Sequence, residues 1–434
     1  MLRFRTPAHR RLRRAAPLVC VLALAALAAG CSGDVSQYPQ SALDPKGDFA
    51  RLTDGLFTTV VWWAVLVFVL VEGALLYAIF RFRGKPSDAE PAQVHGNTTL
   101  EIVWTMIPAI VLAMIAVPTV KAIFKTNEIP TDNPLTIEVV GHQWWWEFRY
   151  PEYGITTANQ LHVPVGRTVS LRMGTVDVLH SFWVPQYAGK RDVFPNRETR
   201  LWFKAEEGGF YPGQCAEFCG IQHGKMAFWI AAQPADSFDM FVKSMQATRG
   251  VSPNGAPMAA PASSGATVAQ AAQQGGQAQQ GQAQQGQAQR PAPQDPAKAG
   301  QQGAGMDPRP AQGVPATGAD TTAGAAGADA RVLAQGQQLF TAKGCVGCHS
   351  LSAVNAPKGM IGPNLAGLGS RGYIAAGVLK NTDANLAQWL RQPQALKEGV
   401  LMPNGLVTEA EAQQLVAYFR ALAQQPATPQ QPQQ

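Results

Sequence analysis

Charged residues are scarce in this chain of 434 residues, at 15% of the sequence. So few charges exclude an all-helical coiled coil, and the 46% share of hydrophobic residues excludes a chain that is disordered throughout. Residues 1–30 contain no acidic residue and six arginines. The net charge of the whole chain is also +6, so the remaining residues sum to zero. The basic excess therefore belongs to the N-terminal segment, and we expect no nucleic-acid partner.

Residues 1–30 have the parts of an export signal, namely arginines, an apolar stretch and small residues at the end. Cys31 follows the run Leu27-Ala28-Ala29-Gly30, which resembles a bacterial lipoprotein box. Lipidation of Cys31 and ordinary cleavage that leaves this thiol free both fit the pattern. Export is expected in either case.

Two long stretches carry almost no charge. Residues 56–80 are interrupted only by Glu72, and residues 99–120 carry Glu101 near their start. Each reaches the ~20 residues that a helix needs to cross the hydrocarbon core of a bilayer. The sequence predicts a transmembrane hairpin within residues 45–125 of a multi-pass protein of the bacterial inner membrane, with both ends on the periplasmic side. We expect Glu72, an acid inside a span, to face a partner subunit.

Residues 131–245 consist of short runs of β-branched and aromatic residues separated by Pro, Gly and Asn. This texture predicts a small β-sandwich or barrel without a long amphipathic helix. The expected strands are residues 135–140, 168–173, 200–204 and 226–231.

Residues 247–328 contain no aromatic residue and no cysteine, and Gln, Ala, Gly and Pro dominate. Such a segment cannot bury enough apolar surface to fold, so it predicts a disordered linker. Residues 329–424 regain large apolar residues. Thr408 and Glu411 form a capping box, and a buried helical face is predicted at Ala412, Leu415, Val416 and Phe419.

The helical segment contains the motif C-x-x-C-H at Cys345, Cys348 and His349, the attachment pattern of a c-type haem. A redox-active dithiol pair explains the histidine poorly. No histidine follows His349, so a methionine is expected as the second axial ligand of the iron. Met360 and Met402 are the candidates, and the greater separation of Met402 from the motif favours it.

A second cluster of metal-binding residue types lies in the β segment, at His180, Cys215, Cys219, His223 and Met226. Thiolate, imidazole and thioether groups together favour copper, and two thiolates could bridge two copper ions. Three alternatives compete with this interpretation. A zinc site would leave Met226 unused, a disulfide between the cysteines would ignore both histidines, and plain core packing suits such residues poorly.

These residues carry a family resemblance. Residues 213–220 with His223 and Met226 resemble the dinuclear copper (CuA) loop of cytochrome c oxidase subunit II, and residues 101–105, 141–144 and 178–185 continue the match. With the C-terminal haem segment, the chain is similar to subunit II of caa-type oxidases. The resemblance implies a cupredoxin-like Greek-key β-barrel or sandwich, followed by an all-α class I cytochrome c domain.

The resemblance also implies roles for individual residues. Copper ligands are implied at His180, Cys215, Glu217 through its backbone carbonyl, Cys219, His223 and Met226. The Glu217 side chain is implied as a ligand of a magnesium ion shared with subunit I, Trp144 as the residue of electron entry, and Glu101 as the mouth of a proton channel. From the residues alone, at least one of three consecutive tryptophans should be core, and Glu101 could be an acid that snorkels from a helix end.

The function implied is electron entry into a haem–copper oxidase. Electrons from a cytochrome c or a membrane-bound donor would pass through haem c and the copper pair to subunit I, where oxygen reduction drives proton pumping. Subunit III and membrane lipid are further expected partners. Net charges of −2 for residues 131–245 and +3 for residues 329–424 favour transient docking of the two domains. A fragment of a nitrous-oxide-type reductase and a copper-carrying assembly lipoprotein are the rival interpretations.

Overall fold

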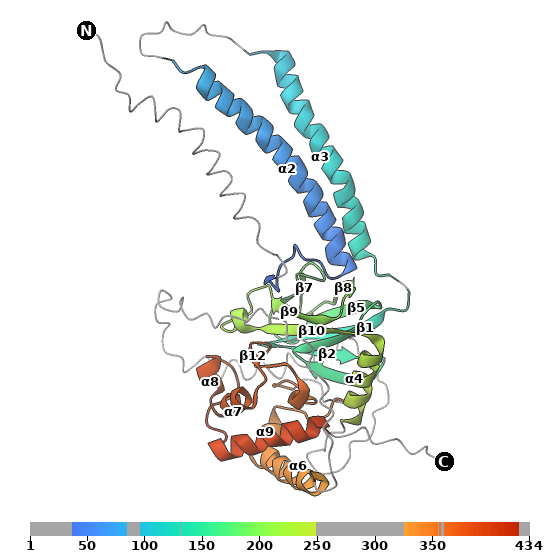
Figure 1. Cartoon of the computed structure of the whole chain (residues 1–434), viewed down its shortest axis with the longest axis vertical. Coiled ribbons are helices and arrows are strands. Elements are labelled where there is room, and N and C mark those ends of the chain that lie inside the picture. Colours follow the sequence, from blue (N-terminus) through green and yellow to red (C-terminus); the bar gives the residue numbers. More distant parts are fainter. Residues whose placement is uncertain are drawn as a thin grey trace, which may run out of the picture.

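The computed structural model describes residues 37–84, 96–130, 132–248, 325–354, 356 and 360–424. The predicted export signal, Cys31 and residues 249–324 of the expected linker lie outside the described residues. A helical hairpin, a β domain and a helical domain follow one another along the long axis, with the β domain in the middle (Figure 1).

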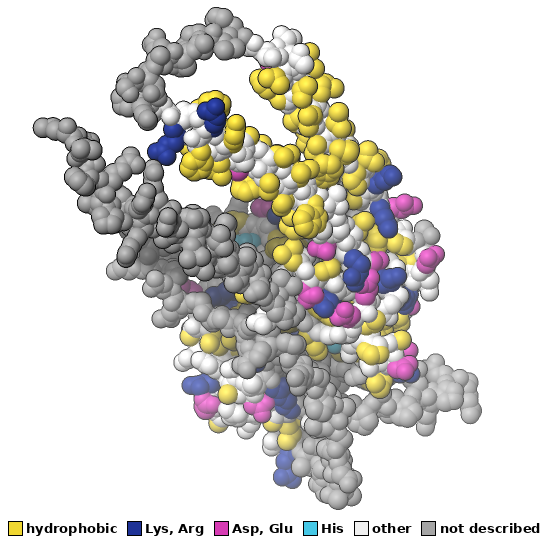
Figure 2. Space-filling view, turned by 45° about the horizontal axis from the view of Figure 1, so that its top comes forward, with side chains coloured by type: hydrophobic (Ala, Val, Ile, Leu, Met, Phe, Trp, Pro, Cys, Tyr) yellow, Lys and Arg dark blue, Asp and Glu magenta, His cyan; other side chains and the backbone are white. Residues whose placement is uncertain are grey.

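The hairpin consists of α2 (Asp48–Arg81) and α3 (Thr98–Asn127), which lie side by side (Figure 1). Both helices are long and apolar enough to cross a membrane, and both extend beyond the predicted spans. The Asn97 side chain caps α3 by accepting a hydrogen bond from the backbone N–H of Leu100. Figure 2 shows apolar side chains exposed along both helices, as expected of segments that face lipid or partner helices.

The β domain contains two five-stranded sheets. The first has the order β3-β2-β1-β5-β8, and the second has the order β4-β10-β9-β6-β7. The strands are β1 (Leu135–His142), β2 (Trp145–Tyr150), β3 (Ile155–Ala158), β4 (Gln160–Pro164), β5 (Thr168–Thr175), β6 (His180–Trp183), β7 (Arg191–Val193), β8 (Thr199–Lys204), β9 (Gly209–Cys215) and β10 (Ala227–Gln233). The predicted sandwich is confirmed, and each of the four expected strand runs falls on a strand.

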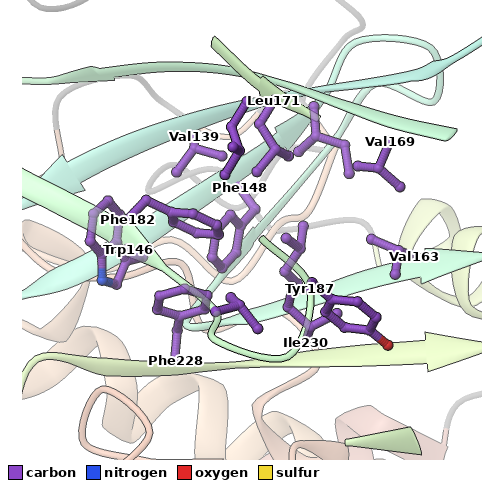
Figure 3. Packing of buried hydrophobic residues seen from close by; sticks show 14 of the residues in the cluster. Val139, Trp146, Phe148, Val163, Val169, Leu171, Phe182, Tyr187, Phe228 and Ile230 are labelled. Carbon is purple, nitrogen blue, oxygen red and sulfur yellow. The ribbon is translucent and has the colours of Figure 1, made fainter. Parts of the chain in front are cut away.

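An aromatic cluster fills the space between the sheets. Trp146 lies edge-on to Phe182 and Phe228, with ring centroids 5.5 and 5.6 Å away, and Phe182 stacks on Phe228 at 4.4 Å (Figure 3). All three rings are fully buried. Because interiors pack as densely as organic crystals, such a cluster holds the strands that frame it in fixed positions.

The expectation of no amphipathic helix in residues 131–245 was wrong. The segment ends in α4 (Ala235–Ala247), which buries Phe238, Val242 and Met245 against the sandwich. These residues recur at positions i, i+4 and i+7, the spacing of one helical face. Polar residues between them give the segment little overall hydrophobicity, so its composition does not indicate a buried helix.

The helical domain is built from α6 (Ala325–Ala342), α7 (Asp383–Arg391), α8 (Pro393–Leu396) and α9 (Glu409–Gln424). Between α6 and α7 lie the 3₁₀ turns η5 (Cys345–Gly347) and η6 (Leu368–Ser370) and the two-residue strands β11 (Tyr373–Ile374) and β12 (Leu379–Lys380). Thr408 and Glu411 exchange the hydrogen bonds of the predicted capping box. The predicted buried face of α9 is also confirmed, and it packs against α6 and α7.

The hairpin is fastened to the first sheet at β8. The Asp48 carboxylate accepts a hydrogen bond from the backbone N–H of Lys204 at 2.8 Å, and Trp202 donates its indole N–H to the carbonyl of Thr126 at 3.0 Å. Arg51 forms an ion pair with Glu206. These contacts join both helices to the end of the sandwich that faces the hairpin.

Candidate metal centre and haem-attachment site

The second sheet brings the copper-ligand candidates together. His180 begins β6 and Cys215 ends β9, and these strands pair with Phe182 opposite Cys215. The backbone N–H of Cys215 donates to the carbonyl of Met226 at 2.9 Å, which closes the intervening loop. A 3₁₀ turn η2 (His223–Lys225) then aims His223 back toward the cysteines.

Six groups converge at this loop. The Cys215 and Cys219 sulfurs are 3.7 Å apart. Cys215 Sγ lies 3.8 Å from His180 Nδ1 and 3.3 Å from the carbonyl oxygen of Glu217. Cys219 Sγ lies 3.7 Å from both His223 Nδ1 and Met226 Sδ. Each sulfur therefore has an imidazole nitrogen and one further soft or carbonyl donor beside it.

The geometry discriminates among the alternatives left open by the sequence. A sulfur separation of 3.7 Å is far longer than the ~2.05 Å of a disulfide, and both cysteines are free thiols. Simple packing would not aim two imidazole nitrogens and a thioether at the same two sulfurs. Met226 Sδ belongs to the donor set, which a tetrahedral zinc site of two cysteines and two histidines would not use.

The two thiols behave as one titrating pair. The hydrogen bond from the Cys219 thiol lowers the pKa of Cys215 to about 3, and the same interaction raises the pKa of Cys219. The hydrogen bond between the sulfurs thus favours a charge on Cys215, although burial opposes charge on both thiols. A bound cation would remove the second proton, as metals do for coordinating thiols.

Asp177 orients His180 and was missed by the sequence interpretation. Its Oδ1 lies 2.8 Å from His180 Nε2, so the ring donates from Nε2 and presents Nδ1 to Cys215. Burial opposes charge on both partners, but their hydrogen bond raises the pKa of His180 and lowers that of Asp177. The available sequence signal was an acid three residues before a candidate ligand.

Trp144 lies directly on the cluster. Its indole Nε1 donates to the carbonyl of Cys219 at 2.9 Å, and the Gln143 side chain donates to the same oxygen at 2.7 Å. Trp144 lies in the turn between β1 and β2, outside the strand that holds Trp145 and Trp146. Trp146 is the expected core residue, whereas Trp145 packs beside Ala376 of the helical domain.

A buried ionic network lies below Trp145. The ring of His142 stacks on Trp145 at 3.9 Å, and His142 Nε2 lies 3.0 Å from the Glu147 carboxylate. Arg149 donates to the other oxygen of Glu147 at 2.6 Å. Burial alone would raise the pKa of Glu147, but Arg149 and His142 together lower it to about 2. Glu147 is therefore ionised and fully partnered inside the domain.

Glu217 and Glu101 lie in different parts of the chain, the first beside the cysteine cluster and the second in the helical hairpin. The Glu217 carbonyl faces Cys215 Sγ, as a backbone ligand would. Glu101 lies in the first turn of α3 and is exposed, far along the chain from the copper loop. Its suggested role in a proton channel and the magnesium role of the Glu217 side chain stay predictions.

The residues of the C-x-x-C-H motif lie together in one turn of the helical domain. Cys345 and Cys348 are free thiols at η5, and the backbone N–H of His349 donates to the carbonyl of Cys345 at 2.9 Å. His349 Nδ1 lies 2.8 Å from the carbonyl oxygen of Pro363 and donates a hydrogen bond to it. Nε2 is therefore the nitrogen that would ligate iron. Burial lowers the pKa of His349, which favours the neutral imidazole.

The candidate methionines both lie in this domain. Met402 packs against the same apolar cluster as Cys345, on the loop between α8 and α9. Met360 is half-buried, two residues before Gly362, which lies against the His349 ring. Assignment of Met402 as the second axial ligand stays a prediction.

Three parts of the chain match models of known protein families. Residues 45–122 match the transmembrane domain of cytochrome c oxidase subunit II, residues 154–233 match its periplasmic domain, and residues 333–423 match cytochrome c. The periplasmic domain of subunit II of cytochrome oxidase (CoxB) from Bradyrhizobium japonicum is 30% identical. It covers 27% of this chain and 96% of that one, with a TM-score of 0.26.

Two relatives match this chain over almost the whole length of both sequences. Cytochrome c oxidase subunit 2 of Alkalihalophilus pseudofirmus is 32% identical over 401 residues, which is 91% of this chain and 93% of that protein. The subunit 2 of Bacillus sp. strain PS3 is 30% identical over 418 residues, or 92% and 95%. The chain therefore belongs to the cytochrome c oxidase subunit II family, in the form that carries a C-terminal cytochrome c domain, and is a membrane-bound subunit of a haem–copper terminal oxidase.

Proposed function

We propose that this subunit admits electrons to the oxidase through haem c and a dinuclear copper centre. The observation that supports it best is the donor set around the two sulfurs, in which imidazole, thioether and carbonyl groups flank an unbonded thiol pair. Copper held by these residues would supply one-electron transfer, and ligands already in place would rearrange little during it.

The residues fit such a group chemically. The set that would hold it comprises His180, Cys215, Glu217 through its carbonyl, Cys219, His223 and Met226. Soft thiolate and thioether donors with imidazoles favour copper over magnesium or calcium. His180, Cys215 and Cys219 are buried and their ligand atoms lie within 4.8 Å of one another.

The surrounding residues hold this set in position before any ion arrives. Asp177 fixes the ring orientation of His180, and Gln143 and Trp144 hold the carbonyl of Cys219. Burial of both cysteines excludes water from the sulfurs. A centre that changes charge by one electron needs this preorganisation, because movement of ligands or water would slow the transfer.

We propose the remaining residue roles and partners from the resemblance to the subunit II family. Trp144 would receive electrons from outside donors, a cytochrome c or a membrane-bound donor, since it contacts the ligand loop directly. The Glu217 side chain would share magnesium with subunit I, and Glu101 would open a proton path. Oxygen reduction coupled to proton pumping would take place in subunit I, with subunit III as a further partner. The hairpin would cross the inner membrane with both domains in the periplasm.

The test is metal content together with electron paramagnetic resonance on the purified full chain in detergent. We expect two coppers for each haem and a spectrum in which one unpaired electron is shared equally by two copper nuclei. Cys219→Ser should lose the shared signal while keeping the haem, and Ser244→Ala on the exposed part of α4 is the control. One exchangeable copper, or zinc alone, would instead place the β domain with metal carriers.

A further inference from the structure

The loop between β11 and β12 has an unusual backbone. Ala375, Ala376 and Gly377 have φ angles of 54°, 57° and 81°, so three consecutive residues are left-handed. We call these three residues the docking turn. Two alanines in this region are costly, because Cβ crowds the following carbonyl. Such strain persists only where surrounding contacts determine the conformation.

Each carbonyl of the docking turn accepts a hydrogen bond. Gly377 accepts the indole N–H of Trp229 at 3.0 Å, and Ala376 accepts the backbone N–H of Ala227 at 3.1 Å. Both donors belong to β10 of the β domain, and Ala227 directly follows the ligand candidate Met226. The carbonyl of Ala375 accepts from Lys397 Nζ at 3.2 Å. The strained turn thus presents two of its three acceptors to the β domain.

Lys397 connects the two domains. Its Nζ also donates to the carbonyl of Lys225 at 2.8 Å, so one amine joins a carbonyl of each domain. The residue is only 2% exposed, and burial lowers its pKa to about 7. A lysine rarely stays buried without partners, and one of the two carbonyls that this amine binds belongs to the other domain.

Aromatic residues extend the contact. Trp229 stacks on Tyr373 with centroids 4.1 Å apart, and Trp145 donates its indole N–H to the carbonyl of Ile361 at 3.3 Å. The N–H of Thr156 in β3 donates to the carbonyl of Ala353 at 2.9 Å. Separation would expose both tryptophans, and soluble surfaces rarely carry large apolar patches without a partner.

We propose that the helical domain with the haem-attachment motif (the haem domain) packs on the β domain with the copper-ligand candidates (the copper domain) in one fixed arrangement. The docking turn and Lys397 hold this arrangement, which we call the seat. This differs from the transient docking that the opposite net charges suggest. On the copper domain the seat involves residues 225–229. This range includes the copper-ligand candidate Met226 and begins two residues after His223. The docking turn and Lys397 are positioning residues, and their importance for electron transfer rests on the proposed function. The fixed arrangement of the two domains does not depend on the proposed function.

The test is cleavage of the linker in the full chain. A protease site is inserted between residues 249 and 324, the detergent-solubilised protein is cut, and the fragments are separated by gel filtration over a dilution series. Haem absorbance and a C-terminal tag follow the haem fragment independently. We expect the wild-type fragment to stay with the membrane fragment. Its separation from the membrane fragment at every dilution would overturn the proposal.

Two pairs of variants identify the contacts that hold the seat. Lys397→Ala removes the donor shared by the carbonyls of Lys225 and Ala375, which should weaken retention roughly tenfold or more. Lys343→Ala is its control, because Lys343 forms a partly exposed ion pair with Glu411 inside the haem domain. Gly377→Ala should also release the fragment, because its Cβ would lie 3.0 Å from the backbone of Ala227.

The control for Gly377→Ala is Gly405→Ala, which has a similar φ of 75° but meets nothing within 4 Å. Both alanine variants bear the same backbone strain, so a difference in retention reports the interface. Equal retention of Lys397→Ala and wild type would contradict the assigned role of Lys397. An unchanged haem spectrum shows that a released domain is folded, and copper content, measured separately, tests the proposed function.

Discussion

The hydrogen bond between Asp177 and His180 gives the sharpest prediction about the metal centre. Asp177 Oδ1 lies 2.8 Å from His180 Nε2, and its Oδ2 accepts the backbone N–H of Gln143 at 2.6 Å. In Asp177→Ala the buried ring can rotate, and either ring nitrogen can carry the proton. Loss of a carboxylate that orients a ligand histidine typically costs about 10–100-fold in metal affinity. We therefore expect copper binding weaker by about 1.4–2.7 kcal/mol.

The assay is competition for copper between the full chain in detergent and a chromophoric chelator. Asp177→Asn keeps one oxygen that can accept from His180, so its affinity should lie much closer to that of the wild type. Glu198→Ala is the matched control, because it removes an acid of the same domain that pairs with Arg172 and Arg200. Wild-type affinity in Asp177→Ala would refute the argument that this hydrogen bond positions the ligand.

Three further predictions concern the other buried features. Because the pKa of Glu147 is about 2, its contribution to stability is complete above its unfolded value and declines as the pH falls toward 2. Glu147→Gln should remove up to about 3 kcal/mol at neutral pH and flatten the acid limb, as measured by denaturant unfolding of the β domain; an unaltered limb would be evidence against this. Gly336→Ala would place Cβ 2.3 Å from the Tyr418 side chain, so it should destabilise the haem domain by about 1–3 kcal/mol in thermal melts despite better helix propensity. His349→Ala should stop electron entry through the haem in stopped-flow reduction while the copper signal persists, and normal haem reduction would oppose its assignment as the axial ligand.

The sequence predicted the local parts of both sites well. Cys215, Cys219, His223 and Met226 lie within one loop, so their spacing alone indicated a common ligand set. The C-x-x-C-H motif is equally local. His180 is 35 residues upstream of Cys215, and its residue type made it a candidate, but its distance from the loop was not fixed by local spacing. The structure explains its place, because β6 and β9 pair in the second sheet.

What the sequence could not show depends on contacts between distant segments. Whether Trp144 is core or functional depended on where β1 ends, and the turn at residues 143 and 144 decided it. The interface joins residues near 227 to residues near 376, and no periodicity relates them. Net charge pointed only to attraction between the domains. The strain of the docking turn and the burial of Lys397 are explained by their contacts with β10 and Lys225, which the sequence does not show.

The two attachments of the β domain lie on different elements of one rigid sandwich. The hairpin is fastened at β8 in the first sheet. The haem domain contacts β10 in the second sheet and also Trp145 and β3 in the first sheet, and it lies on the side away from the hairpin (Figure 1). The aromatic cluster around Trp146 and Phe228 fills the space between these sheets (Figure 3). A dense core transmits displacement instead of absorbing it. Fixed attachment at both ends would therefore hold the haem domain at a constant separation from the membrane, with the copper loop between them, and electron transfer at a constant separation needs no diffusive search by the haem domain.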